Sequence, residues 1–314
     1  TKGGTRYVIS LIPLGGYVKL QGENETEGIK GEPSEYLSKS VGERSRIIFA
    51  GPMLNYILAF LIFSFVFIIG SPTLTTTVGK VLDDYPGKRA GLEEGDKILS
   101  INDEEVLYWD DITRIIHTTK EYELVLKIER EGIPLTLKVV PKDEEITTLF
   151  GSKKKVGLIG IAPSEDVIFV KYNIPTSFYM GGKKLIDLSY MTVRALWASA
   201  TGAIPFKESI TGPVGIFYIT GQAARMGIVY LLQLMALLSM SLAIFNLLPL
   251  PILDGGHLLF LLIEKIRKKP VSYKVQENIQ QAGFVLLITL MLFVFYNDFV
   301  KFGIFDKITS LWRK

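Results

Sequence analysis

Three long stretches with almost no charged side chains constrain this chain more than any other feature of its sequence. Residues 47–79 hold no Asp, Glu, Lys or Arg, and neither do residues 278–297. A third stretch, residues 226–263, carries one formal charge, the carboxylate of Asp254. A helix needs about 20 apolar residues to cross a hydrocarbon core. The stretches therefore predict three membrane segments, at residues 47–70, 227–250 and 278–300.

The composition agrees with a membrane protein and excludes several other functions. Of the 314 residues, 48% are hydrophobic and only 21% are charged, a balance too apolar for an ordinary soluble enzyme. The net charge of +3 is too small to indicate a nucleic-acid partner. Because the chain has no cysteine, disulfides, thiolate catalysis and cysteine-bound metals are excluded.

Basic residues beside the apolar stretches predict the orientation. Lys39, Arg44 and Arg46 precede the first segment, and five Lys and Arg residues lie between Glu264 and Glu277. Short basic loops stay in the cytoplasm, so residues 71–226 are expected outside it. The basic C-terminal tail weakly favours the opposite orientation. The chain is accordingly predicted to divide into eight segments: 1–46 (hairpin and cytoplasmic loop), 47–70 (span), 71–163 (soluble domain), 164–226 (connection), 227–266 (broken segment), 267–277 (basic loop), 278–300 (span) and 301–314 (tail).

The long insert is predicted to hold a small α+β domain. Four runs are typical of strands: Val78–Leu82, Lys97–Ile101, Tyr122–Arg130 and Pro134–Val140, the last two joined by a turn at Glu131-Gly132. Between them, Asp110 is expected to cap a helix that runs through His117. Beyond the domain, residues 183–204 read as a helix that lies at the membrane surface.

Two segments of the insert resemble a PDZ domain of the bacterial protease type. They are the run Ala90–Asn102 and the short motif Gly157, Leu158, Ile159, Gly160 and Ile161. The motif is similar to the loop and strand that receive a peptide, where backbone amides hold a terminal carboxylate and an edge strand accepts another strand. The alternative is that this strand is an internal one.

The third apolar stretch is interrupted by Asn246, Pro249 and Pro251 just before Asp254. A carboxylate at bilayer depth costs about 2.5–3.5 kcal/mol, and broken backbone survives there only inside protein or beside water. Asp254 is therefore a candidate ligand of a metal or other cation. The alternative is that Asp254 lies at the interface and caps the helix that follows.

Two further segments are candidates for the site. Residues 7–20 are too short and too interrupted to span, and Gly15-Gly16 favours a tight turn, so we expect a hairpin that dips into the membrane or merely joins two spans. Its unpaired edge could receive an unwound substrate segment as an added strand. Gly51, Pro52 and Asn55 open the first span, where Gly51 permits close packing and Asn55 can bond across helices.

Together these motifs resemble the site-2 protease family of intramembrane zinc metalloproteases, most nearly its regulator-of-sigma-E branch. The resemblance implies a multi-pass α-helical membrane protein with a re-entrant β-hairpin and an inserted PDZ domain, in the bacterial inner membrane. It implies Zn2+ bound by Asp254, transmembrane substrates (anti-sigma factors or signal-peptide remnants), and contact with membrane lipid. The implied substrate-binding residues are Asn246, Pro249, Leu14, Gly15, Gly16, Tyr17 and Val18, and Gly51, Pro52 and Asn55 are implied to lie near the site.

One family motif is missing from the sequence. The first span of the family carries His-Glu-x-x-His, which binds zinc and activates water, whereas the two histidines here are His117 and His257. His257 is expected to be structural. We expect that the missing span lies upstream, that the full protein is the enzyme, and that this chain by itself is inactive. The alternatives are a membrane-anchored PDZ adaptor without catalysis and, less well supported, a transporter with a broken helix.

Overall fold

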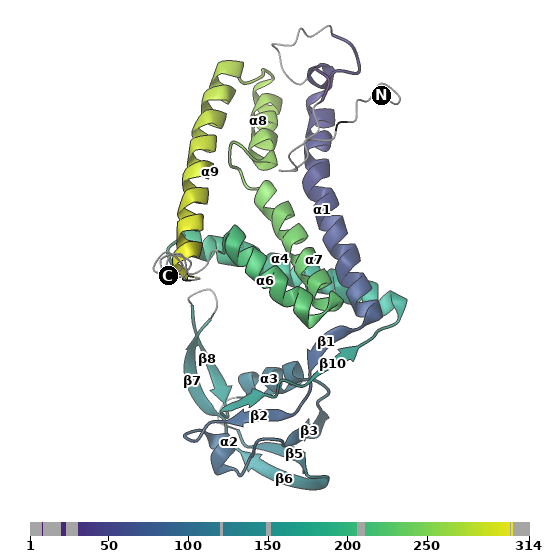
Figure 1. Cartoon of the computed structure of the whole chain (residues 1–314), viewed down its shortest axis with the longest axis vertical. Coiled ribbons are helices and arrows are strands. Elements are labelled where there is room, and N and C mark those ends of the chain that lie inside the picture. Colours follow the sequence, from purple (N-terminus) through teal and green to yellow (C-terminus); the bar gives the residue numbers. More distant parts are fainter. Residues whose placement is uncertain are drawn as a thin grey trace, which may run out of the picture. The chain divides into compact units, whose positions relative to one another are not determined.

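The computed structural model describes residues 8, 20–22, 31–119, 122–148, 152–205, 211–301 and 303 (Figure 1). The chain divides into unit 1, residues 1–53 and 246–283, and unit 2, residues 54–245 and 284–314. The helices are η2 (Tyr36–Ser38), α1 (Val41–Ile69), α2 (Pro86–Arg89), α3 (Trp109–Thr118), α4 (Ile174–Ala200), α6 (Pro213–Met226), α7 (Ile228–Asn246), α8 (Asp254–Arg267) and α9 (Tyr273–Lys301). The strands are β1 (Ser71–Leu74), β2 (Val78–Val81), β3 (Lys97–Ile101), β4 (Glu104–Glu105), β5 (Leu124–Arg130), β6 (Ile133–Val139), β7 (Lys142–Thr147), β8 (Lys153–Leu158), β9 (Ile161–Pro163) and β10 (Val167–Val170).

Within the described part of the chain, three helices are long and apolar enough to cross a membrane: α1, α7 and α9. The first begins at Val41, earlier than the predicted start at residue 47, because its charged first turn is capped. Ser40 and Glu43 form a reciprocal capping box: the Ser40 amide donates to Glu43 at 2.9 Å and the Glu43 amide donates to the Ser40 hydroxyl at 3.3 Å. The charged residues before the apolar run therefore belong to the same helix.

The broken segment predicted at residues 227–266 consists of two helices. α7 ends at Asn246, and α8 begins at Asp254 after a turn that holds both prolines. α9 begins at Tyr273, so Lys274, expected in the basic loop 267–277, lies in the first turn of a helix. Arg44 of α1 forms an ion pair with Glu264 of α8 within unit 1, which joins the charged ends of these two helices.

The described residues of the soluble domain in unit 2 form four small antiparallel sheets. A four-stranded sheet has the order β4-β3-β5-β6, and three two-stranded sheets pair β1 with β10, β2 with β9 and β7 with β8. The core lies between these sheets and α3, and its fully buried side chains include Leu92, Ile98, Leu126 and Ile128. The sequence-based strand predictions are close to the observed bounds, and Glu131 and Gly132 form the predicted turn, each with positive φ (49° and 82°).

Two predictions about this domain are wrong in detail. The helix cap is Tyr108 rather than Asp110, and the acid that closes the first turn is Asp111, which accepts the Leu107 and Tyr108 amides at 3.3 Å each. The predicted end at residue 163 is too early, because β10 (Val167–Val170) pairs with β1 from Ser71↔Val170 to Leu74↔Val167. The two strands that lead into and out of the domain are thus hydrogen-bonded to each other.

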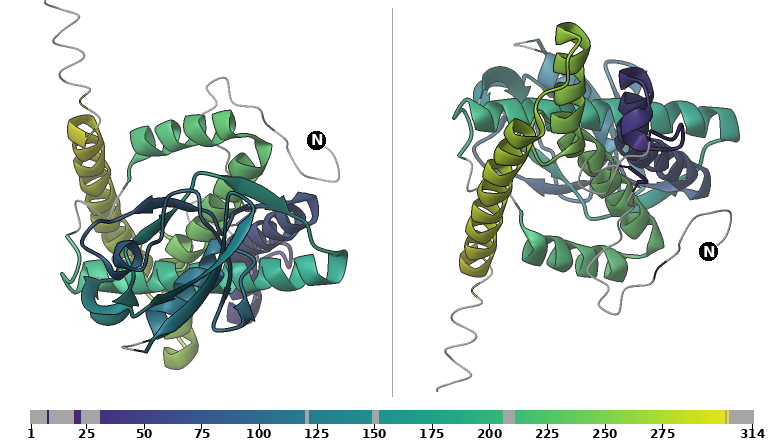
Figure 2. Two further views of the ribbon diagram at one scale, coloured as in Figure 1. Left: turned by 90° about the horizontal axis from the view of Figure 1, so that it is seen from below. Right: turned by 90° about the horizontal axis from the view of Figure 1, so that it is seen from above.

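Helix α4 packs against α1 and α7 within unit 2. It lies across the direction of α7 in Figure 1 and in both views of Figure 2. Leu185 of α4 joins a buried cluster with Ala59 and Phe63 of α1 and Ala236 and Met240 of α7. The close approach depends on Gly181, because a Cβ there would lie 2.8 Å from the Ser64 amide nitrogen. The predicted surface helix 183–204 is thus the second half of a longer helix that starts at Ile174.

A buried carboxylate joins α9 to α6 in unit 2. Asp298 is 0% exposed, and its two oxygens accept the amides of Gly212 at 3.0 Å and Gly215 at 2.9 Å. These amides belong to the N-terminal turn of α6, which has no acceptor within its own helix. The start of α6 is therefore held by an acid that lies 83 residues or more away in the sequence.

Candidate functional site

The site in unit 1 is built around the turn that separates α7 from α8. This turn closes through backbone hydrogen bonds from Leu250 to Leu248 at 2.7 Å and from Leu253 to Leu250 at 3.0 Å. The first turn of α8 packs directly on it, because a Cβ on Gly255 would collide with the carbonyls of Leu247 and Leu248. Small residues at the start of α8 are therefore required for the turn to fold back against the helix.

Asp254 is the first residue of α8, and its carboxylate is partly buried. The helix cap is Leu253, and no side chain makes a capping hydrogen bond there. Asp254 also accepts no hydrogen bond from any residue in the described part of the chain. The interpretation of Asp254 as a helix cap is therefore wrong. A partly buried carboxylate without a donor is left with its charge available to a cation.

Gly51 faces Asp254 within unit 1. A Cβ on Gly51 of α1 would lie 3.6 Å from Oδ2 of Asp254, so the missing side chain keeps the space beside the carboxylate open. The neighbouring Pro52 is buried in the interior of α1, where it removes one backbone donor from the helix. Gly51, implied by the family resemblance to lie near the site, therefore borders the carboxylate.

The described residues do not complete a zinc site. A catalytic zinc ion takes three protein ligands, and no group of three His, Cys, Asp or Glu residues gathers anywhere among the residues that the structure describes. His257 follows Asp254 by one helical turn and so shares a face of α8 with it. The donor set fits one ligand of a zinc ion, and we derive no catalytic step from it.

The other predicted site residues have mixed outcomes. Asn246 is the last residue of α7, and its side-chain amide has no hydrogen-bond partner in the described ranges. At Asn55 the main-chain carbonyl, not the side chain, makes the bond between helices, accepting the Ser239 hydroxyl of α7 at 2.9 Å. The hairpin residues Leu14, Gly15, Gly16, Tyr17 and Val18 lie outside the described residues.

A second candidate site lies in the soluble domain of unit 2. The predicted peptide-binding motif runs from the end of β8 to the start of β9, and its residues Leu158 to Ile161 line a cavity of about 170 Å³. The opposite wall is α3, through Trp109, Ile112, Thr113, Ile116 and His117. Ile159 and Gly160 use their carbonyls to accept the Gly87 and Leu82 amides at 2.8 and 2.9 Å, whereas their own amides donate to no described residue. The loop therefore presents free donors beside an apolar groove.

Charges around this groove are arranged by neighbouring side chains. Burial, and to a lesser extent the positive charge of Lys154, lowers the pKa of His117 below its ordinary value of 6.5. The ring is consequently neutral at physiological pH. Tyr85 packs against Gly160, whose φ of +78° suits glycine, and its hydroxyl donates to Glu144 at 2.9 Å.

The run Ala90–Asn102 owes part of its pattern to one buried ion pair. Asp96 is 0% exposed. Its carboxylate accepts hydrogen bonds from Nε and Nη2 of Arg130 at 2.7 and 2.8 Å and from the Glu93 amide at 2.9 Å. Burial alone raises the pKa of Asp96, but these hydrogen bonds and the Arg130 charge outweigh it and hold the pKa below 3.8. The acid in this run is therefore structural.

Sequence reasoning missed three residues that hold helix ends in these units: Ser40, Glu43 and Asp298. The partners of Asp298 lie far away in the sequence, so no local signal predicts its role. The Ser40–Glu43 capping box, by contrast, is visible in the sequence as Ser-x-x-Glu before the first apolar run. That pattern would have placed the start of α1 correctly.

Three apolar helices, a helix break ahead of an acid and an inserted α+β domain define a membrane protein built around a broken helix. The chain belongs to peptidase family M50, whose model matches residues 1–290, which confirms the resemblance to site-2 proteases. The zinc metalloprotease RasP of Oceanobacillus iheyensis is 35% identical over 84% of this chain and 61% of its own length. The regulator of sigma-E protease RseP of Escherichia coli is 29% identical over 96% of this chain and 88% of its own length.

Among solved structures, the PDZ domain of an SdrC-like protein from Listeria innocua is 21% identical and covers 29% of this chain and 96% of its own, with a TM-score of 0.24. A second, from Listeria monocytogenes, is 20% identical over 29% of this chain and 87% of its own, with a TM-score of 0.23. These scores are too low to carry an argument. The PDZ assignment therefore stays a prediction from the sequence motif and the groove.

Proposed function

We propose that this chain is the greater part of a zinc-dependent intramembrane endopeptidase that cleaves single-span membrane proteins. In this proposal Asp254 is one zinc ligand, and a His-Glu-x-x-His helix outside this sequence supplies two imidazoles and the catalytic glutamate. Zinc in such peptidases activates a water molecule and polarises the peptide carbonyl. The names of the relatives RasP and RseP, a zinc metalloprotease and a regulator of sigma-E protease, support this assignment.

The observation that carries the proposal is the state of the Asp254 carboxylate. It is partly buried after a broken apolar segment, no described residue donates a hydrogen bond to it, and Gly51 leaves space beside it. A charge at membrane depth needs a partner, and a divalent cation that shares ligands with neighbouring helices would supply one. His257 stays a structural residue in this proposal.

The remaining site residues are proposed to hold the substrate. Asn246, with its amide free at the end of α7, and Pro249, exposed in the turn, would contact an unwound substrate segment. The hairpin residues Leu14 to Val18 would add a strand to the same segment, which exposes its peptide bonds. Gly51, Pro52 and Asn55 would shape the helix that faces them.

The proposed setting is regulated proteolysis in the bacterial inner membrane, of the kind that releases a sigma factor under envelope stress. Substrates would be anti-sigma-factor-like proteins or signal-peptide remnants whose outer domains another protease has already trimmed. The basic residues beside α1 and after α8 favour a cytoplasmic location for those ends. Residues 71–226 would then lie on the extracytoplasmic side.

The soluble domain is proposed to be a PDZ domain that screens substrates. The free amides of Ile159 and Gly160 would receive a terminal carboxylate, and the groove along α3 would receive an apolar side chain. Replacing Thr113, which lines the groove, by tryptophan should reduce binding of a peptide with a free C-terminus. Thr118→Trp, on the exposed side of the same helix, is the matched control, and equal binding by both variants would contradict this role.

The zinc role is tested by Asp254→Asn in the full-length protein. Cleavage of a single-span reporter should fall by more than about 100-fold, since even residues that only support zinc ligands are worth about 10–100-fold. The amount of protein in the membrane should stay unchanged, and bound zinc, measured by mass spectrometry of the metal, should fall. Asp187→Asn, at an exposed acid of α4, is the control. Normal cleavage by Asp254→Asn would contradict the proposal.

The alternative function is a membrane-anchored PDZ adaptor without catalysis. It is favoured by one observation: the sequence holds no His-Glu-x-x-His motif. The coding sequence upstream of Thr1 distinguishes the two functions. A membrane helix with that motif supports the peptidase, whereas a full-length protein without the motif and without bound zinc supports the adaptor.

A further inference from the structure

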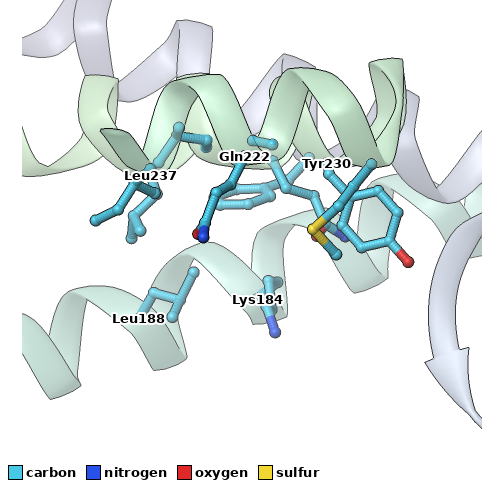
Figure 3. A pocket seen from close by; sticks show the side chains of 11 residues that line it. Lys184, Leu188, Gln222, Tyr230 and Leu237 are labelled. Carbon is cyan, nitrogen blue, oxygen red and sulfur yellow. The ribbon is translucent and has the colours of Figure 1, made fainter. Parts of the chain in front are cut away.

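A cavity of about 330 Å³ lies among four helices of unit 2, apart from both sites described above. Its walls come from Phe63 of α1, from α4, from α6 and from α7 (Figure 3). The lining residues are Phe63, Lys184, Leu188, Ile219, Gln222, Ala223, Met226, Tyr230, Gln233, Leu234 and Leu237. The volume is at the lower end of the range of about 300–1,000 Å³ that is usual for ligand pockets.

The cavity is lined mainly by apolar side chains, with a few polar groups among them. Tyr230 is the third residue of α7 and Leu237 the tenth, so Leu237 lies about 10 Å farther along the helix at 1.5 Å per residue. Figure 3 shows Leu237, Leu188 and Gln222 toward one end and Tyr230 toward the other, with Lys184 between them.

Lys184 brings a positive charge to the cavity. It is an exposed residue of α4 that lines the cavity, and no described carboxylate forms an ion pair with it. The side-chain amide of Gln222 adds hydrogen-bond donors to the same lining, and so does that of Gln233, which also donates to the Ser71 hydroxyl at 3.5 Å. A cation and neutral donors among apolar side chains match a ligand with an anionic head and a hydrocarbon tail.

The helices that line the cavity also carry exposed apolar side chains. Phe217 on α6 is 81% exposed, Trp197 on α4 is 73% exposed and Ile228 at the start of α7 is 64% exposed. Exposed apolar and aromatic side chains on such helices are typical of the boundary between headgroups and acyl chains. These helices therefore present the kind of surface that contacts lipid.

We propose that this cavity binds one anionic phospholipid, with its phosphate beside Lys184 and the start of an acyl chain between Leu188 and Leu237. A fatty acid offers one carboxylate to a lining with more donors than that group needs. The phosphodiester and ester carbonyls of a phospholipid match the lining better.

The test is native mass spectrometry of the full-length protein in mild detergent, with phosphatidylglycerol and phosphatidylcholine of identical acyl chains. The protein should retain phosphatidylglycerol preferentially. Lys184→Gln should weaken its binding at least about fivefold, the worth of one lysine near an anionic surface. The matched control is Lys183→Gln, which removes an exposed charge that does not line the cavity.

A second pair of variants tests the place of binding. Leu237→Trp should fill the space beside Leu188 and abolish retention, whereas Leu242→Trp, at a 54% exposed position on the same helix outside the cavity, should not. Equal retention of both lipids, equal weakening by Lys183→Gln, full binding by Leu237→Trp, or oleate binding as tightly as phosphatidylglycerol would each overturn the proposal. The readout does not depend on proteolysis, so it stands apart from the proposed peptidase function.

Discussion

Replacing Asp298 by asparagine should loosen the start of α6 without unfolding the rest of the protein. The Asp298 carboxylate accepts hydrogen bonds from the backbone amides of Gly212 and Gly215. Asp298 is 0% exposed, so water does not reach these bonds. Asparagine keeps one acceptor oxygen and turns an NH2 group toward the other amide. One buried donor of the helix end then loses its partner.

The expected cost follows from these contacts. A hydrogen bond to a charged group is worth about 1.5–3 kcal/mol, and the favourable interaction of a carboxylate with a helix N-terminus adds about 0.3–1 kcal/mol. The loss is therefore about 2–4 kcal/mol. At about 1.4 kcal/mol for each factor of ten, local opening of α6 should become about 30- to 700-fold more frequent.

Hydrogen exchange read by mass spectrometry measures this opening directly. Amides of residues 213–226 should exchange faster in Asp298→Asn by the stated factor, while the core strands β3 and β5 keep their rates. Asp187→Asn, which removes an exposed acid of α4, should change neither. If exchange in α6 rises by less than about threefold, the two hydrogen bonds do not hold the helix and the reasoning is refuted.

Three other substitutions test packing and charge. Arg130→Leu should destabilise the soluble domain by about 3 kcal/mol at pH 7, the lower end of the range for a broken buried ion pair, because the Arg130 side chain is 26% exposed. Since the ion pair lowers the pKa of Asp96 in the folded state, this cost should shrink as the pH falls below 3.8. Proteolysis of the variant and the unchanged protein across pH measures the difference. Gly181→Leu should separate α4 from α1 and reduce the folded protein recovered from membranes, whereas Gly182→Ala, where the new Cβ meets Phe60 at an ordinary 3.5 Å, should be tolerated. Gly255→Ala should displace Asp254 and reduce reporter cleavage at least about tenfold. The control Gly42→Ala, where the new Cβ would have no atom within 4 Å, should leave cleavage unchanged. Equal cleavage by both variants would argue against the rigid turn.

The sequence predicted the elements that depend on local pattern. The absence of charge located the three apolar helices, and the alternation of Leu124, Leu126 and Ile128 located β5, because these signals need no knowledge of distant residues. The break before Asp254 was also local, since Pro249 and Pro251 cannot continue a helix. In each case the chain alone carries the information.

Contacts between distant segments were not predictable in the same way. Asp298 caps a helix that begins at Pro213, and β10 pairs with β1 across nearly one hundred residues. Arg44 in α1 finds Glu264 in α8. A single sequence shows that such residues are polar or β-branched, but their partners are set by packing, and only the structure names them.

Because β1 pairs with β10, the soluble domain enters and leaves the rest of the chain through two adjacent strands. Leu74 and Val167 are directly opposite each other, so their Cα atoms lie about 5 Å apart, a gap that a two-residue hairpin turn can close. Everything between them can be exchanged, duplicated or shortened while the helices on either side receive the same two strands. A membrane protein of this design can acquire a new soluble domain without rebuilding its apolar helices.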